Sequence, residues 1–274
     1  MKKRKRYFQT EISRLFHKKE LYFSVMGIVL ILFLSANDGM GNMGGSVLSS
    51  VLLSSYDAGF LVAFSLASIP YAAAFTDDLE YNYAKYLVVR GSLGKYVFSK
   101  MLVIFISSML TMGIGITCFS MLCSLKLPWV DEGMAEYISM FGGYRSFLDH
   151  GQYLLWFWFY GMQWGIFAGI LSMAAAFFSL FWPNKLLVFS VPVLLYQILI
   201  EFGADSFRKI AALDPRVVFD ARHNIWNSDW KMLAWAFLLG AAAWLLLGFA
   251  GMLQSKSNLV KCQEENKKDF LEEG

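Results

Sequence analysis

The chain has 274 residues, of which 57% are hydrophobic, 17% aromatic and only 16% charged. A soluble domain typically carries about a quarter charged residues. The composition therefore excludes a soluble globular protein, a disordered protein and a DNA-binding domain. The formal net charge of +3 is small, and its placement along the chain is more informative than its size.

Charged residues are excluded from long stretches of the chain. Residues 101–125 and 232–255 carry no charge, and 35 residues between Asp149 and Lys185 contain no Asp, Glu, Lys or Arg. A bilayer core takes roughly 20 apolar residues per helix. We therefore predict an all-α polytopic membrane protein with six transmembrane helices. The predicted spans are residues 21–36, 58–75, 101–125, 152–182, 186–202 and 232–255.

The first 20 residues predict an amphipathic helix that precedes a transmembrane domain of residues 21–255. Phe8, Ile12, Leu15 and Phe16 recur at the spacing of one helical face, among many basic residues. Such a helix lies in the headgroup region of a membrane. The alternative is a basic flank that only sets the orientation of the first span.

The segment between the second and third predicted spans predicts a short cytoplasmic helix. Asp77, Asp78 and Glu80 lie at its start, whereas Lys85 and Arg90 come later. That order suits a helix dipole, because anions are stabilised near a helix N-terminus and cations near its C-terminus. One face at helical spacing carries Leu79, Tyr83, Tyr86 and Leu87. A stiff helix joined to two spans would act as a lever; the alternative is an ordinary loop helix on the membrane surface.

These residues make the chain resemble the type-2 ABC export permeases. In that family an acidic start leads into a cytoplasmic coupling helix, then a basic turn, then a Tyr-x-x-x-Lys entry into the third span. The corresponding elements here are Asp78 and Glu80, residues 83–89, Arg90, and Tyr96 with Lys100. Within the family the chain is most similar to small bacterial permeases of peptide or lantibiotic export and immunity systems.

The resemblance implies a transport subunit without catalytic residues of its own. Its partners would be ABC ATPase subunits and a second permease subunit, in a homodimer or heterodimer. The chain itself would bind no cofactor, since ATP and Mg would belong to the ATPase. The residues that would couple to that partner are Asp78, Leu79, Glu80, Tyr83, Tyr86, Leu87 and Arg90. The sequence agrees, because it contains no Walker phosphate-binding motif.

Three glycines lie at four-residue spacing in the fourth predicted span. Gly161, Gly165 and Gly169 fall near one helical face and permit close approach of another helix. We predict that they pack against a helix of the same subunit. A dimer seam or a substrate path is the alternative.

Few ionisable residues lie near the predicted membrane interior. Asp57 and Glu201 come closest, at the outer boundary, and are candidates for an outer vestibule. Secondary transporters usually place ionisable coupling sites near the bilayer midplane, so their scarcity argues against an ion-driven carrier. We predict no metal site, because no His, Cys, Asp and Glu cluster has metal-ligand spacing.

The basic residues set the predicted orientation. With the N-terminus inside, 17 of the 24 Lys and Arg residues fall on the cytoplasmic side, as the positive-inside rule requires. We therefore predict a multi-pass protein of the cell membrane with both termini cytoplasmic, residues 256–274 forming a cytoplasmic tail. The long outer segment after the fifth span contains Asp214-Pro215, which is a favourable helix start.

Three functions remain open from the sequence. The first is the permease subunit of an ATP-driven exporter that moves an amphipathic peptide or lipid-like substrate outward. A channel or secondary carrier that works without ATP is the second. The third is a membrane protein that senses a toxic peptide, or gives immunity to it, through its outer loops.

Overall fold

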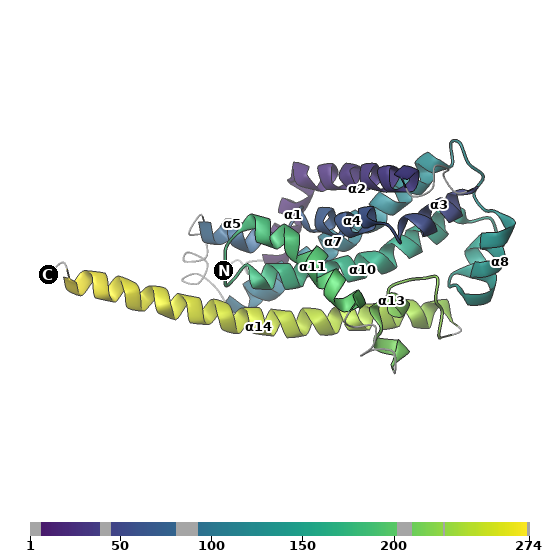
Figure 1. Ribbon diagram of the computed structural model, residues 1–274. Helices are drawn as coiled ribbons and strands as arrows, with labels where there is room; N and C mark the ends of the chain where they lie inside the picture. The colour runs from purple at the N-terminus through teal and green to yellow at the C-terminus, as the bar shows by residue number, and fades with distance from the viewer. Residues whose placement is uncertain (1–6, 39–44, 81–92, 202–209, 227, 273–274) are drawn as a thin grey trace, which may run out of the picture.

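The computed structural model describes residues 7–38, 45–80, 93–201, 210–226 and 228–272 (Figure 1). Side chains are described to residue 258. The described residues form helices and connecting turns, with no β-strand among them. The fold class predicted from the sequence is therefore correct at the level of an all-helical, strongly apolar chain.

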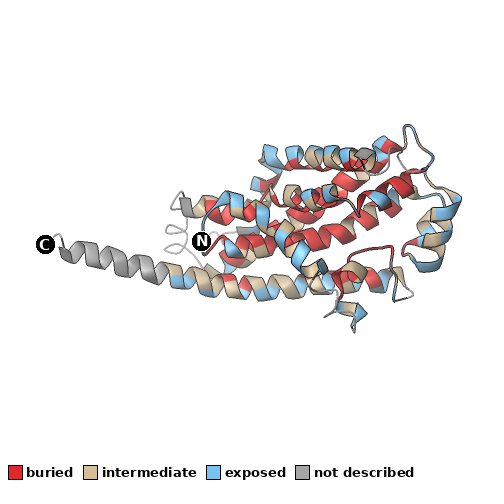
Figure 2. Ribbon diagram, in the orientation of Figure 1, coloured by how far each residue is buried: buried red, intermediate tan, exposed pale blue. Residues whose placement is uncertain are grey.

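Two long helices form the centre of the bundle. They are α7 (Leu93–Cys123) and α10 (Tyr153–Phe178), and most of their residues are buried. Around them lie α2 (Lys19–Asp38), α4 (Ala58–Ser68), α11 (Lys185–Glu201) and α14 (Asp229–Glu272). Figure 2 shows that α2 and α14 keep many exposed residues along their length. Large apolar side chains such as Phe23 and Leu246 account for part of that exposure.

The three predicted packing glycines lie along the contact between the two central helices. A Cβ atom would meet Gly113 at Gly161, the Met109 backbone oxygen at Gly165, and the Phe105 ring at Gly169. The partner positions fall as the glycine positions rise, so α7 and α10 run in opposite directions. Close backbone approach is possible there because glycine has no side chain.

Within the described part of the chain, four helices are long and apolar enough to cross a membrane: Lys19–Ala36, Leu93–Cys123, Tyr153–Phe178 and Asp229–Asn258. A fifth crossing is reached if the bent pair of α3 (Val47–Ser54) and α4 counts as one span. The remaining predicted span corresponds to α11, which is 17 residues long and contains Pro192. Six spans therefore remain a prediction.

The second predicted span differs most from the sequence-based expectation. Residues 58–75 are not one helix, because α4 ends at Ser68 and α5 (Ala74–Glu80) follows after a turn. On its N-terminal side α4 instead follows the helix α3, and the two helices meet at a bend of 80°. Residues 37–57 separate the first two predicted spans, yet they contain the helix α3, which is almost wholly buried. The hydroxyls of serines in α3 and of Ser55, which follows it, donate hydrogen bonds to nearby backbone carbonyls. Burial of these serines is possible for that reason.

The short helices divide between the two ends of the bundle (Figure 1). At one end lie α1 (Tyr7–His17) and α5. Toward the other end lie α8 (Glu132–Phe141), α9 (Arg145–Asp149), the 3-10 turn η1 (Ala211–Leu213) and α13 (Pro215–Val218). The helix start predicted at Asp214-Pro215 is confirmed, because the Asp214 carboxylate accepts from the Arg216 N–H at 2.9 Å. The last helix continues without a break into the predicted tail, to Glu272.

Candidate functional site

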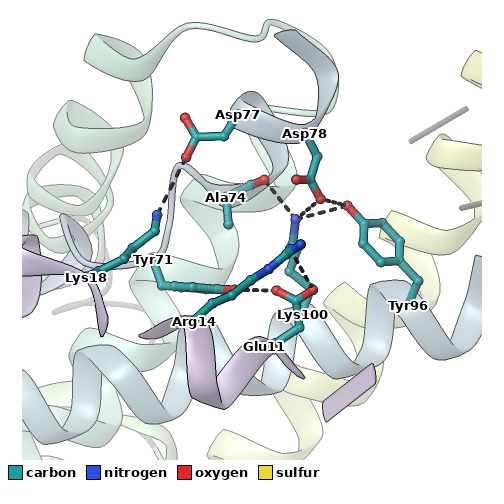
Figure 3. A network of polar contacts seen from close by, with 9 residues as sticks. All are labelled: Glu11, Arg14, Lys18, Tyr71, Ala74, Asp77, Asp78, Tyr96 and Lys100. Carbon is teal, nitrogen blue, oxygen red and sulfur yellow. Dashed lines mark hydrogen bonds and ion pairs between the residues drawn. The ribbon is translucent and has the colours of Figure 1, made fainter. Parts of the chain in front are cut away.

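A network of charged and phenolic side chains, buried at its centre and partly exposed at its rim, lies where α1, α5 and α7 meet (Figure 3). We call it the basal network. Its side chains are Glu11, Arg14, Lys18, Tyr71, Asp77, Asp78, Tyr96 and Lys100. They come from segments far apart in the sequence, so the network joins the N-terminal helix to the central bundle.

Lys100 is the centre of the network and is only 1% exposed. Its ammonium donates to the Asp78 carboxylate, to the Ala74 carbonyl at 2.8 Å and to the Tyr96 hydroxyl at 3.0 Å. An ammonium has three N–H donors, so each donor has a partner here. Because an unpaired buried charge is very costly, these bonds fix α5 firmly against the first turns of α7.

The sequence favours this arrangement locally. Tyr96 and Lys100 are four residues apart in α7 and therefore share one helical face. The Tyr96 hydroxyl donates to the same Asp78 carboxylate that pairs with Lys100. One carboxylate near the end of α5 thus accepts from two side chains of α7.

The N-terminal helix joins the network through Glu11. This carboxylate is buried, accepts from the Tyr71 hydroxyl, and pairs with Arg14 at 3.4 Å. The Lys18 ammonium lies 5.1 Å from the centre of the Tyr71 ring, in cation–π geometry. Tyr71 belongs to the turn between α4 and α5, so α1 is bound directly to that turn.

The rim of the network is an open pocket of about 450 Å³. Asp77 stands at this rim and pairs with Lys18 at 3.7 Å and with Lys185, the first residue of α11, at 3.0 Å. The pocket is lined by Arg14, His17, Lys18, Tyr71, Ala74, Asp77, Asp78 and Lys100. Its walls carry both signs of charge, and the helix α11 is tied to it by a partly exposed ion pair.

The predicted coupling residues divide at this point of the chain. Asp78 lies within the basal network. Leu79 and Glu80 end α5, but their side chains lie outside the described residues, as do Tyr83, Tyr86, Leu87 and Arg90 entirely. The segment expected to contact an ATPase therefore directly follows the basal network in the sequence.

Sequence reasoning missed Glu11 and Tyr71 as members of a site. A signal for Glu11 was present, since it is a lone carboxylate in a basic helix, four residues before the buried Leu15. For Tyr71 the sequence offers no such signal, because its partner lies 60 residues away.

The two predicted vestibule residues contact different helices. Asp57 accepts from the Ser35 hydroxyl of α2 at 3.1 Å, beside the bend between α3 and α4. Glu201 is exposed at the end of α11, where it accepts from Gln197. Their role in a vestibule remains a prediction. Among the described residues, no group of three or more His, Cys, Asp or Glu side chains is placed to hold a metal ion.

Comparison with protein-family models, with characterised proteins and with solved structures finds no match to this chain. The arguments on function therefore rest on the residues and their geometry.

Proposed function

We propose that this chain is the membrane-spanning permease subunit of an ATP-driven exporter. ATP hydrolysis would take place on separate ATPase subunits, and a second permease subunit, identical or similar, would complete the transport path. The proposal joins the resemblance of residues 78–100 to the type-2 ABC export permeases with the geometry of the basal network.

The observation that carries the proposal is the position of Asp78. This residue is the first of the predicted coupling residues, and its side chain lies within the described part of the chain. Its carboxylate is bound to both Lys100 and Tyr96 of α7. A displacement of the segment after Glu80 would therefore act on α7 through charge-assisted hydrogen bonds rather than through a loose loop. Charge-assisted bonds in a dry environment are among the stronger polar contacts in proteins.

The central helices would carry such a displacement across the bundle. The α7 and α10 backbones are in close contact at their glycines, so a shift of one moves the other. Glu11 and Tyr71 connect the same unit to α1, and Asp77 connects it to α11 through Lys185. The mechanism we propose is that closure of the ATPase subunits moves this connected unit and changes the access of substrate to the path.

The substrate class follows from the apolar character of the chain. Phe, Trp and Met side chains are abundant in this strongly apolar chain, and apolar surfaces cannot replace the hydration shell of a sugar or an ion. An amphipathic peptide or a lipid-like molecule is the substrate this composition favours. Outward transport follows from the family resemblance.

The test is co-purification of the full chain with an ATPase subunit from the same cells, followed by ATP turnover in proteoliposomes. Charge reversal at Glu80 or Arg90 should weaken the association and reduce turnover, because both charges lie in the predicted contact segment. Charge reversal at Arg145, an exposed residue of α9 near the other end of the bundle, is the matched control and should change neither quantity.

Two results would contradict the proposal. If reversal at Glu80 and at Arg90 leaves association and ATP turnover unchanged, this segment does not couple to an ATPase. If the purified chain alone transports an amphipathic substrate without ATP, the chain is a self-contained carrier or channel instead.

A further inference from the structure

The segment between Asp214 and Asn224 enters the helical bundle from the end opposite to the basal network. The Val218 carbonyl accepts from the Gln163 side chain of α10 at 2.6 Å, and the Phe219 ring stacks on Phe167 with centroids 4.9 Å apart. Phe167 lies 14 residues after the first residue of α10, which is about 21 Å along a helix axis. The segment therefore reaches about half-way along a central helix.

A buried ion pair lies at the end of this segment. The Arg222 guanidinium contacts the Asp220 carboxylate at 2.5 Å and 2.7 Å, and the two side chains are 7% and 3% exposed. The same carboxylate accepts from the Arg222 backbone N–H at 3.0 Å. Because the residues are two positions apart, the pair is complete within the segment and does not need another helix to neutralise it.

The guanidinium of this pair contacts the bend between α3 and α4. The Arg222 guanidinium donates to the Leu52 carbonyl, near the end of α3, at 3.4 Å. It also lies over the Tyr56 ring at 4.2 Å, and Tyr56 is part of the bend itself. A helix C-terminus carries partial negative charge and carbonyls without helical partners, so a guanidinium stabilises the end of α3 at this position.

The opposite side of the segment is bound to the connection between α8 and α9. The Ala221 carbonyl accepts from the Gly143 N–H at 2.7 Å, and the Asn224 N–H donates to the Phe141 carbonyl at 2.8 Å. The segment is thus held by backbone bonds on one side. On the other side, Arg222 reaches the bend through one long hydrogen bond and one cation–π contact.

We propose that Asp220 and Arg222 form a latch that holds the bend of α3 and α4 closed against the segment 214–224. Release breaks the contacts of Arg222 with Leu52 and Tyr56, whereas the ion pair with Asp220 stays intact and moves as one neutral unit. A neutral unit avoids the large cost of exposing or stranding a single buried charge. The bend at Ser55–Asp57 is then the place where this end of the bundle opens.

The same local motif occurs a second time in this segment. Asp214 and Arg216 form the same two-residue pair, with the backbone N–H of Arg216 bound to the carboxylate at 2.9 Å and the guanidinium at 2.7 Å. Arg216, however, is 41% exposed. Local pairing of Asp-x-Arg is therefore shared by both copies, whereas the contact with the bend belongs to Arg222.

The latch is testable by cysteine accessibility in the full chain within a membrane. Ala221→Cys places a reporter thiol at a buried position, in a chain whose three native cysteines are replaced by alanine. The probe is a membrane-impermeant maleimide, applied to each side in turn. Tyr56→Leu removes the cation–π contact, Arg222→Met removes both contacts, and Arg222→Lys keeps the charge but loses the planar fork of donors.

We expect slow labelling of the reporter in the otherwise unchanged chain. Tyr56→Leu and Arg222→Met should each raise the rate by on the order of tenfold or more, since local opening is governed by the contacts that it breaks. Tyr22→Leu, at an exposed tyrosine of α2, and Arg216→Met are the matched controls and should leave the rate unchanged. Arg222→Lys should lie between the two groups.

Fast labelling of the reporter before any latch residue is changed would overturn the proposal. An unchanged rate in Tyr56→Leu and in Arg222→Met would overturn it as well. If Arg222→Met fails to accumulate in the membrane, Tyr56→Leu and Arg222→Lys decide, because Tyr56 is largely exposed and its loss leaves the ion pair intact. The assay needs neither ATP nor a partner, so its outcome is independent of the exporter proposal, and the side of access reports the orientation separately.

Discussion

The two ends of the bundle bury charge in opposite ways. The basal network collects its residues from α1, the turn before α5, α5 and α7, and its central pair, Asp78 and Lys100, is separated by 22 residues. The Arg222 latch has both members of its ion pair in one short segment, two residues apart. A composite pair holds helices together and cannot be opened without leaving charges unpaired. A local pair can move as one unit and break only its outer contacts.

The difference suggests a division of roles between the ends. The basal network makes the end with α1 and α5 a rigid junction, which suits transmission of a displacement. The latch makes the end with α13 a place of reversible contact, which suits opening. Each of the following predictions tests this difference between the two ends.

The largest effect should come from Asp78→Asn. It leaves the Lys100 ammonium buried without a carboxylate, and breaking a buried pair in this way costs about 3–5 kcal/mol of folding free energy. Asp77→Asn is the matched control, because Asp77 is the neighbouring residue but is 31% exposed in its ion pairs. Partly exposed pairs are worth about 0–1 kcal/mol. Unfolding of both variants in detergent micelles measures the difference, and equal losses would show that the basal network is not a rigid junction.

A smaller loss is expected from Arg222→Met. Asp220 keeps its hydrogen bond from the backbone N–H, so we expect about 2–3 kcal/mol, below the cost of a fully stranded buried charge. Arg216→Met removes the same residue type from the same local motif at a more exposed position and should cost less than Arg222→Met. The same unfolding measurement applies. If Arg216→Met costs as much folding free energy as Arg222→Met, or more, the contacts of Arg222 with the bend add no stability.

Gly165→Ala tests whether the two ends are joined through the centre. The new Cβ would lie 2.5 Å from the Met109 backbone oxygen, so α7 and α10 must separate, at a cost of about 1–3 kcal/mol. Gly133→Ala in α8 meets only a carboxylate oxygen at 3.7 Å and gains up to about 1 kcal/mol of helix propensity. Thermal unfolding distinguishes the two. An Ala at position 165 without cost would mean that the central seam is loose.

The smallest effect concerns pH at Asp214. Burial alone would raise the pKa of this carboxyl, but the hydrogen bonds and charge of Arg216 outweigh it and lower the pKa below its ordinary value of 3.8. A depressed folded-state pKa contributes stability above the ordinary value, and that stability is lost as pH falls through the folded value. Asp214→Asn should therefore flatten part of the stability loss seen below about pH 4 in the parent chain. An unchanged acid limb would show that the pair is not formed in solution.

Much of the fold follows from the sequence because hydrophobic runs and helix signals are local. The uncharged stretches predicted the apolar parts of α7, α10 and α14, although α7 begins at Leu93 and α14 continues to Glu272, well beyond the predicted bounds. Asp214-Pro215 predicted the start of α13. The helices around the second predicted span differ from the sequence-based expectation for a tertiary reason. Val47–Ser54 forms a helix that can be buried because its serine side chains are hydrogen-bonded. This helix meets α4 at an 80° bend, at residues 55–57.

Sequence reasoning identified only some of the residues of the candidate site. Asp78, Tyr96 and Lys100 attracted attention because they lie near one another in the chain and match a motif. Glu11 and Tyr71 did not, because only packing of α1 against the turn before α5 brings them together.

The sequence alone determined an all-helical, strongly apolar chain and the approximate positions of its central helices, and it contains two Asp-x-Arg segments. Tertiary structure decided which copy matters. Both carboxylates accept from the backbone N–H two residues later, since that bond depends on local geometry. Arg222 lies against the bend of α3 and α4, where its guanidinium contacts the Leu52 carbonyl and the Tyr56 ring. Contacts between residues 170 positions apart depend on how whole helices pack, and local spacing carries no record of that packing.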